Sequence, residues 1–141
     1  MPRRSEVAST ASELRIVLGQ LVRRLRVEHR FPISQGAVLG RLDRGGPQTT
    51  SALAAAERVR PQSMAQTVAE LEAEGLVGRT PDPDDRRQVM IGLTERGGRV
   101  LAEDRSRREG WLADAIATEL TAEEQAVLAR AVPLLRRLAQ L

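Results

Sequence analysis

The fold is decided by residues 71–97, which read LEAEGLVGRTPDPDDRRQVMIGLTERG. Within this stretch, residues 76–80 and 89–93 are short runs of β-prone side chains. Residues 81–88 between them are rich in turn-forming and charged residues,. The pattern therefore predicts a β-hairpin with a long, charged tip. Gly75, just before the hairpin, is placed to end a preceding helix in the left-handed conformation,.

Three helices are expected before the hairpin. The first is short, is capped by Ser34 and is stopped by the Gly-Gly-Pro at 45–47,. The second covers residues 51–59, with hydroxyl caps from Thr49-Thr50,. The third begins at Arg60-Pro61, because a proline in the first turn loses no intrahelical hydrogen bond there.

The core face of this third helix is formed by Met64, Val68 and Leu71, which lie at i, i+4 and i+7,. A tight turn joins the second helix to the third. This order of elements is that of a winged helix-turn-helix, in which the second helix of the pair lies in the major groove of DNA.

Both ends of the chain predict amphipathic helices that need a partner. A helix over about residues 6–30 carries an a/d stripe, formed by Val7, Ala11, Leu14, Leu18, Leu21 and Leu25,. After the hairpin, Thr94 caps a helix that passes through the charged residues 103–109,. Thr121 and Glu124 match a capping box that opens the last helix, in which Pro133 should produce a kink,.

The composition excludes several classes of protein. The chain has 141 residues, 41% of them apolar, which suits one globular domain, and no segment approaches the ~20 apolar residues of a membrane span,. No secretory signal is recognisable at the start, so a cytoplasmic location is expected. The absence of cysteine excludes disulfides, thiolate metal sites and cysteine nucleophiles,. An aromatic content of 1% argues against stacking platforms for single-stranded nucleic acid,.

The local distribution of charge favours DNA where the net charge of +3 does not. Residues 60–69 contain no acid, whereas Glu70, Glu72 and Glu74 crowd the second half of the same helix. The positive end of the helix dipole and an acid-free surface suit phosphate.

The sequence resembles the MarR family of bacterial transcription regulators over essentially the whole chain. Three motifs carry this resemblance: LEAEGLVGR at 71–79, DPDDRR at 82–87 and LTERG at 93–97. The resemblance implies a mainly α fold with a small β-hairpin wing. Within one domain of residues 1–141, residues 31–99 would form the winged helix-turn-helix head, and residues 1–30 and 100–141 would form interlocking dimerisation helices.

The same resemblance implies a homodimer that reads a pseudo-palindromic operator in double-stranded DNA. Members of the family often have a small anionic or phenolic ligand that releases the DNA, and a regulator without a ligand is the alternative for this chain. The expected function is that of a sequence-specific, homodimeric repressor. No catalytic residue, metal ligand or cofactor is expected, and the enzyme motifs GxGxxG, GxxxxGK[ST] and HExxH are absent from the sequence,.

The resemblance also suggests roles for individual residues. Arg87 is similar to the wing-tip arginine that enters the minor groove, and Asp85 to the carboxylate that orients it. Arg79 and Arg86 are similar to residues that contact backbone phosphate. In the recognition helix the candidates for DNA contact are Arg60, Gln62, Ser63, Gln66 and Thr67,. Many family members instead have Ser at position 60, Thr at 65 and Arg at 66, so the chain departs from the commonest pattern at these three positions.

Simpler interpretations stand beside these. Arg87 could be a solvated loop charge, and the aspartates of the hairpin tip are explained by turn chemistry because a calcium loop would need Gly at position 87 and Glu at 93. His29 is expected to act as a cation at the C-terminus of the first helix, and Trp111 to pack in a dimer interface. Two alternative functions remain open at this point: a helical protein-protein interaction module that does not bind DNA, and a non-specific architectural DNA-binding protein.

Overall fold

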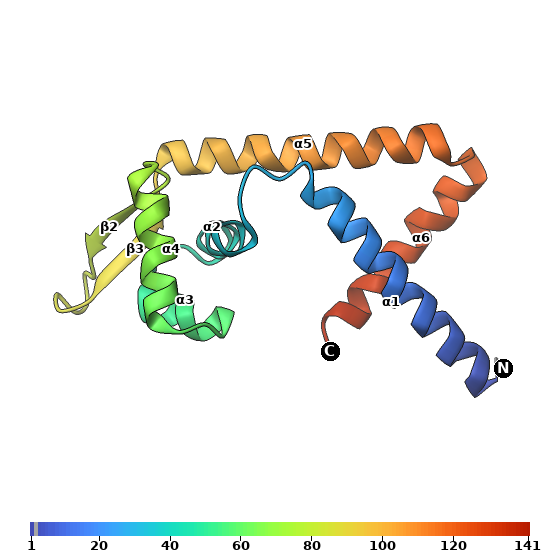
Figure 1. Cartoon of the computed structure of the whole chain (residues 1–141), viewed down its shortest axis with the longest axis horizontal. Coiled ribbons are helices and arrows are strands. Elements are labelled where there is room, and N and C mark those ends of the chain that lie inside the picture. The colour runs from blue at the N-terminus through green and yellow to red at the C-terminus, as the bar shows by residue number, and fades with distance from the viewer. Residues whose placement is uncertain (2) are drawn as a thin grey trace. The chain divides into compact units, whose positions relative to one another are not determined.

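The computed structural model of the chain describes residue 1 and residues 3–141 (Figure 1). Six helices and a small sheet follow one another in the order α1 (Arg4–Arg26), α2 (Ile33–Gly45), β1 (Gln48–Thr49), α3 (Thr50–Glu57), α4 (Pro61–Ala73), β2 (Val77–Pro81), β3 (Val89–Leu93), α5 (Glu95–Glu119) and α6 (Ala122–Ala139). The predicted fold class, mainly α with a small β wing, is confirmed.

The chain forms two compact units. Residues 29–105 make up one unit, here called the head, and residues 1–28 together with 106–141 make up the other, here called the terminal unit. The long helix α5 contributes residues to both units.

The core of the head is built from α2, α3, α4, the hairpin and the first turns of α5. The predicted core face of α4 is confirmed, since Met64, Val68 and Leu71 are buried. They join a cluster of Phe31, Val38, Leu39, Leu42, Leu53, Ala54, Leu76, Val77, Ile91, Val100 and Leu101. Burial of this apolar surface is the main force that holds the head together.

The hairpin is confirmed, and it belongs to a sheet of three strands in the order β1-β3-β2. Both pairs are antiparallel, with Val77 opposite Leu93 and Pro81 opposite Val89. The sequence did not predict β1, because two residues are too few to show the alternation of a strand. Its residue Gln48 pairs with Ile91 of β3.

Local signals placed several helix ends correctly. Thr49 caps α3 by accepting a hydrogen bond from the N–H of Ala52 at 3.1 Å. Thr121 and Glu124 form the predicted capping box of α6. Gly75 has a φ of 74°, as expected for the residue that ends α4,.

Three local predictions were wrong. Helix α1 ends at Arg26 rather than near residue 30, and α2 begins at Ile33 after Pro32, without a side-chain cap from Ser34. His29 therefore lies beyond α1, where its Nδ1 is 3.2 Å from Oδ2 of the buried Asp104 of α5. His29 is thus placed by its contact with Asp104 and does not lie at the C-terminus of α1. No local pattern could reveal it, because tertiary folding brings the two residues together.

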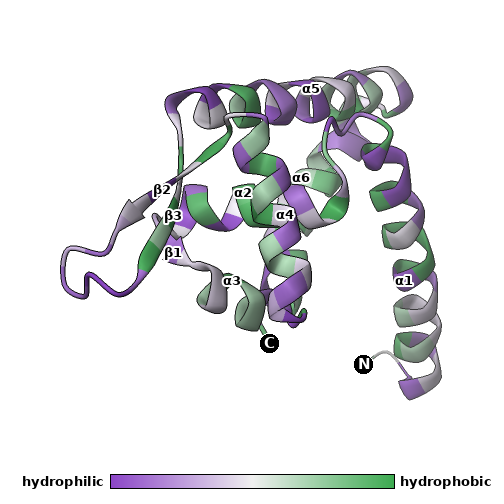
Figure 2. Cartoon of the chain, turned by 60° about the vertical axis from the view of Figure 1, so that its left-hand side comes forward, coloured by the Kyte–Doolittle hydropathy of each residue, from purple (hydrophilic) through white to green (hydrophobic). Residues whose placement is uncertain are grey.

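The terminal unit lacks a core of its own. Within the described residues, α1 and α6 contain no buried side chain, and α5 contains none after Asp104. On the predicted stripe of α1, Val7 is 54% exposed and Leu18 is 41% exposed. Figure 2 shows apolar residues along α1 between polar ones. Helices of this kind are stable when another helical surface covers their apolar faces.

Candidate nucleic-acid interface

The candidate interface begins with the first turns of α4. Arg60 is the N-cap and Pro61 the first helical residue, and no acidic residue lies in the first turn. Of the predicted DNA-contacting residues on this helix, Arg60, Gln62, Ser63 and Gln66 are exposed and Thr67 is half-buried. Since Met64 and Val68 anchor the opposite face in the core, these polar side chains share one accessible surface,.

Hydrogen bonds within α4 already engage two of these residues. The hydroxyl of Thr67 donates to the carbonyl of Ser63 at 3.1 Å, so this hydroxyl retains acceptor capacity only,. The side-chain amide of Gln66 donates to the carboxylate of Glu70 at 3.4 Å. The hydrogen bond to Glu70 therefore partly orients the side chain of Gln66.

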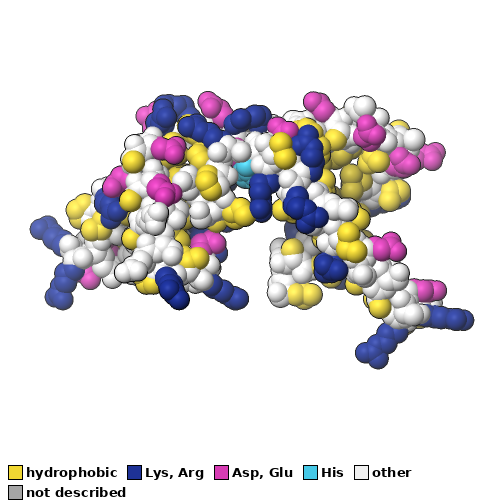
Figure 3. Space-filling view, in the orientation of Figure 1, with side chains coloured by type: hydrophobic (Ala, Val, Ile, Leu, Met, Phe, Trp, Pro, Cys, Tyr) yellow, Lys and Arg dark blue, Asp and Glu magenta, His cyan; other side chains and the backbone are white. Residues whose placement is uncertain are grey.

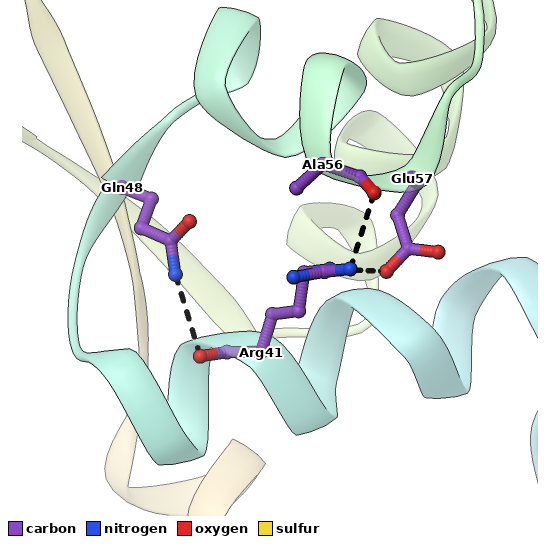
Figure 4. Close-up of polar contacts among 4 residues, drawn as sticks. All are labelled: Arg41, Gln48, Ala56 and Glu57. Carbon is purple, nitrogen blue, oxygen red and sulfur yellow. Dashed lines mark hydrogen bonds and ion pairs between the residues drawn. The ribbon is translucent and has the colours of Figure 1, made fainter. Parts of the chain in front are cut away.

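The turn between α3 and α4 is held by an arginine of α2. The Arg41 guanidinium pairs with the Glu57 carboxylate and donates to the carbonyl of Ala56 at 3.1 Å (Figure 4). The amide of Gln48 in turn donates to the carbonyl of Arg41 at 3.4 Å. These bonds join α2 both to the C-terminal end of α3 and to β1, just before the turn that leads to α4.

The same turn contains a basic residue that sequence reasoning missed. Arg58 is exposed and adopts the left-handed conformation, with a φ of 56°. Its position two residues before Arg60 in a tight turn was the available signal. Arg58 and Arg60 place two positive charges at the start of α4.

The tip of the wing is ordered by its own aspartates. The N–H of Asp84 donates to Asp82 Oδ1 at 2.9 Å, and the N–H of Arg87 donates to Asp85 Oδ1 at 3.1 Å. The N–H of Gln88 donates to the carbonyl of Asp85 at 3.0 Å. The turn-chemistry interpretation of these aspartates is confirmed.

Asp85 contacts Arg87 through the main chain of the loop. Its carboxylate accepts from the main chain of Arg87, and in the described residues no ion pair joins it to the guanidinium. A carboxylate two residues upstream reaches the backbone N–H most easily, which is why the Asx turn forms. Asp85 thus shapes the loop that carries Arg86 and Arg87, and the basic side chains extend from the end of the wing (Figure 3).

Arg79 is placed differently from the wing-tip arginines. Its Nε lies 2.9 Å from the carboxylate of Glu72, and both side chains are nearly half exposed. An exposed pair of this kind contributes at most about 1 kcal/mol. Arg79 is therefore held against α4 by a weak ion pair.

The base of the wing is fastened to α4 and α5. The Thr94 hydroxyl donates to the carbonyl of Gly75 and accepts from the N–H of Gly97. The Arg96 guanidinium donates to the carbonyl of Glu74 at the end of α4, at 3.1 Å. The LTERG motif at 93–97 thus connects α4, the hairpin and α5 through hydrogen bonds.

In the part of the chain that the structure describes, no group of three or more histidine, aspartate and glutamate side chains is placed to hold a metal ion. No helix among the same residues is both long and apolar enough to cross a membrane.

Comparisons with known proteins agree with this architecture. Residues 31–89 match the MarR family. An HTH-type transcriptional regulator from Mycobacterium bovis is 37% identical over 131 residues, which is 91% of each chain. A second HTH-type regulator, from Mycobacterium leprae, is 35% identical over 134 residues and 93% of each chain.

Comparison with solved structures leads to the same family. A transcriptional regulator protein from Pseudomonas aeruginosa is 42% identical and superposes with a TM-score of 0.87 over 99% of each chain. A MarR family protein from Bacillus stearothermophilus, 24% identical, shares the fold with a TM-score of 0.81 over the whole of both chains. With its winged helix-turn-helix head and relatives at this level of identity, the chain belongs to the MarR family of DNA-binding transcriptional regulators.

Proposed function

We propose that the protein is a homodimeric repressor that binds a pseudo-palindromic operator in double-stranded DNA. The observation that carries this proposal is the pairing of an acid-free, exposed start of α4 with a basic wing tip in one head. A helix of this kind fits the major groove, and an arginine on a flanking hairpin fits the minor groove beside it. The base-contacting candidates are Arg60, Gln62, Ser63 and Gln66, with Thr67, Arg79, Asp85, Arg86 and Arg87 completing the surface.

The homodimer is supported by the terminal unit. Its helices bury no side chain among the described residues, although α1 and α6 carry apolar stripes. Two copies can cover each other's stripes, as coiled-coil helices do. Two symmetric heads would then require an operator with two symmetric half-sites.

Repression and release follow from occupancy of the operator. A dimer bound across a promoter excludes other proteins from the same duplex. We propose that a small anionic or phenolic ligand lowers the affinity for DNA, an expectation that rests on the family resemblance.

The test is selection of duplexes from a randomised pool by the wild-type chain. The expected result is an inverted repeat whose half-sites lie about one helical turn apart, bound with a steep dependence on salt. Enrichment of no sequence, with strong salt-dependent binding, would indicate an architectural DNA-binding protein. Absence of any binding would leave a protein-protein interaction module as the better description.

Replacing Arg87 with alanine is expected to weaken binding to the selected duplex by about 1–3 kcal/mol, because the minor-groove contact is lost. The melting temperature should change little, since residue 87 is exposed. Fluorescence anisotropy titration at fixed salt measures the affinity. Arg130→Ala removes the same charge from exposed surface of α6 and serves as the control. Equal weakening by both variants would reduce the role of Arg87 to net charge.

A further inference from the structure

We propose that Glu70 is a positioning residue that orients the side-chain amide of Gln66 to read adenine and reject guanine in the major groove. The proposal rests on the DNA-binding function proposed above and deepens it. It concerns three residues from two helices: Gln35 of α2, and Gln66 and Glu70 of α4.

These three side chains form a chain of hydrogen bonds. The Gln35 amide nitrogen donates to Glu70 Oε2 at 3.0 Å, and the Gln66 amide nitrogen donates to Glu70 Oε1 at 3.4 Å. Each oxygen of the carboxylate therefore receives one amide donor. Gln35 is only 8% exposed, so water has little access to compete for its amide,. The buried glutamine thus holds the carboxylate in place for the exposed one.

The chemistry of Glu70 decides which way the amide of Gln66 faces. An ionised carboxylate accepts hydrogen bonds and cannot donate them. The Gln66 nitrogen must therefore face Glu70, and its carbonyl oxygen must point the other way. Turning the amide over would bring two oxygens together and would break the bond.

An amide held in this way distinguishes purines. In the major groove adenine presents the N6 amino donor beside the N7 acceptor, whereas guanine presents two acceptors, O6 and N7. One N–H of Gln66 is engaged by Glu70, and the carbonyl oxygen and the second N–H remain. These two groups match adenine. Guanine would place its O6 against the carbonyl oxygen of Gln66, unless the amide turned over.

Glu70→Gln tests this mechanism because a glutamine at position 70 can either donate or accept. The amide of Gln66 could then turn over at little cost and accommodate guanine. The probe is the duplex that the wild-type chain selects from the randomised pool, together with variants in which each A·T pair is replaced in turn by G·C. Affinities are measured by anisotropy at constant salt.

For the wild-type chain we expect one position in each half-site at which the exchange of adenine for guanine weakens binding by about tenfold or more. Gln66→Ala should abolish the difference in affinity between adenine and guanine at that position. Glu70→Gln should reduce this difference to a few-fold. The other positions should keep their wild-type pattern. The double variant should show the same discrimination as Gln66→Ala alone, because Glu70 acts only through Gln66.

Glu74→Gln is the matched control. It removes the same charge at the C-cap of α4, where the carboxylate lies 3.9 Å from Arg30 and does not contact Gln66. It should raise affinity for all duplexes slightly and leave the pattern unchanged. Gln35→Met provides a second route to the same result, since it removes the anchor of Glu70 and should lower the same adenine-to-guanine ratio.

Several outcomes would overturn the proposal. If Glu70→Gln shifts affinity equally for every duplex, as Glu74→Gln does, Glu70 contributes charge and not orientation. If Gln66→Ala leaves the base preference unchanged at every position, Gln66 reads no base. In both cases the wild-type chain still prefers its selected duplex, so the proposed function survives. A wild-type chain that prefers no duplex would overturn the regulator proposal and this inference together.

Discussion

Gly97→Ala is expected to destabilise the protein severely. A β-carbon at this position would lie 2.0 Å from the carbonyl oxygen of Leu76 and 2.9 Å from its carbonyl carbon. Both atoms belong to the backbone of a buried residue, so no side chain can swing aside. The start of α5 would have to separate from the hairpin, and the hydrogen bond from the Gly97 N–H to Thr94 would be lost. We expect a loss of about 3 kcal/mol or more in the free energy of unfolding, measured by urea titration.

The neighbouring glycine provides a matched control. A β-carbon on Gly98 would meet no atom within 4 Å, and this residue also lies in α5. Gly98→Ala should therefore raise the free energy of unfolding by up to about 1 kcal/mol, because alanine favours helix. If the two alanine variants unfold alike, the close approach of α5 to Leu76 does not exist in solution.

The second large effect is expected from Leu18→Asp. Leu18 lies at the centre of the apolar stripe of α1, in a unit whose helices bury nothing among the described residues. If a second copy covers this stripe, an aspartate there would place a charge in an apolar interface and break the pair. We expect monomers in sedimentation equilibrium. Affinity for the selected duplex should fall by about 10²–10⁴-fold, because the two heads are no longer linked.

Gln20→Asp is the control for this variant. It introduces the same carboxylate two residues away, on the face of α1 opposite the stripe,. It should remain dimeric and bind DNA normally. A wild-type chain that sediments as a monomer, or a Leu18→Asp variant that remains a dimer, would contradict the homodimer proposal.

The parts of the fold that depend on local chemistry were predictable from the sequence. A threonine before a helix, a glycine after one and two β-prone runs around a turn each act over a few residues, so Thr49, Gly75 and the hairpin were correctly anticipated. Strand β1 and the pairing of His29 with Asp104 were not, because both depend on segments that only tertiary folding brings together.

The same distinction between local chemistry and tertiary packing applies to the candidate site. The distribution of acids along α4 indicated which half of the helix could approach phosphate. The contact between Gln35 and Glu70 was not predictable, because it joins two helices and depends on the packing between them. Asp85 was associated with the correct neighbour, but the atom it binds is the backbone nitrogen of Arg87.

The Asx turns at the end of the wing have one more consequence. A loop that is already shaped by Asp82 and Asp85 gives up little conformational entropy when a guanidinium enters a groove,. The cost of ordering these residues is met during folding, before any encounter with a duplex. In the proposed complex with DNA, a hairpin ordered in advance would therefore bind best to a groove whose width fits it and less well to a groove of another width.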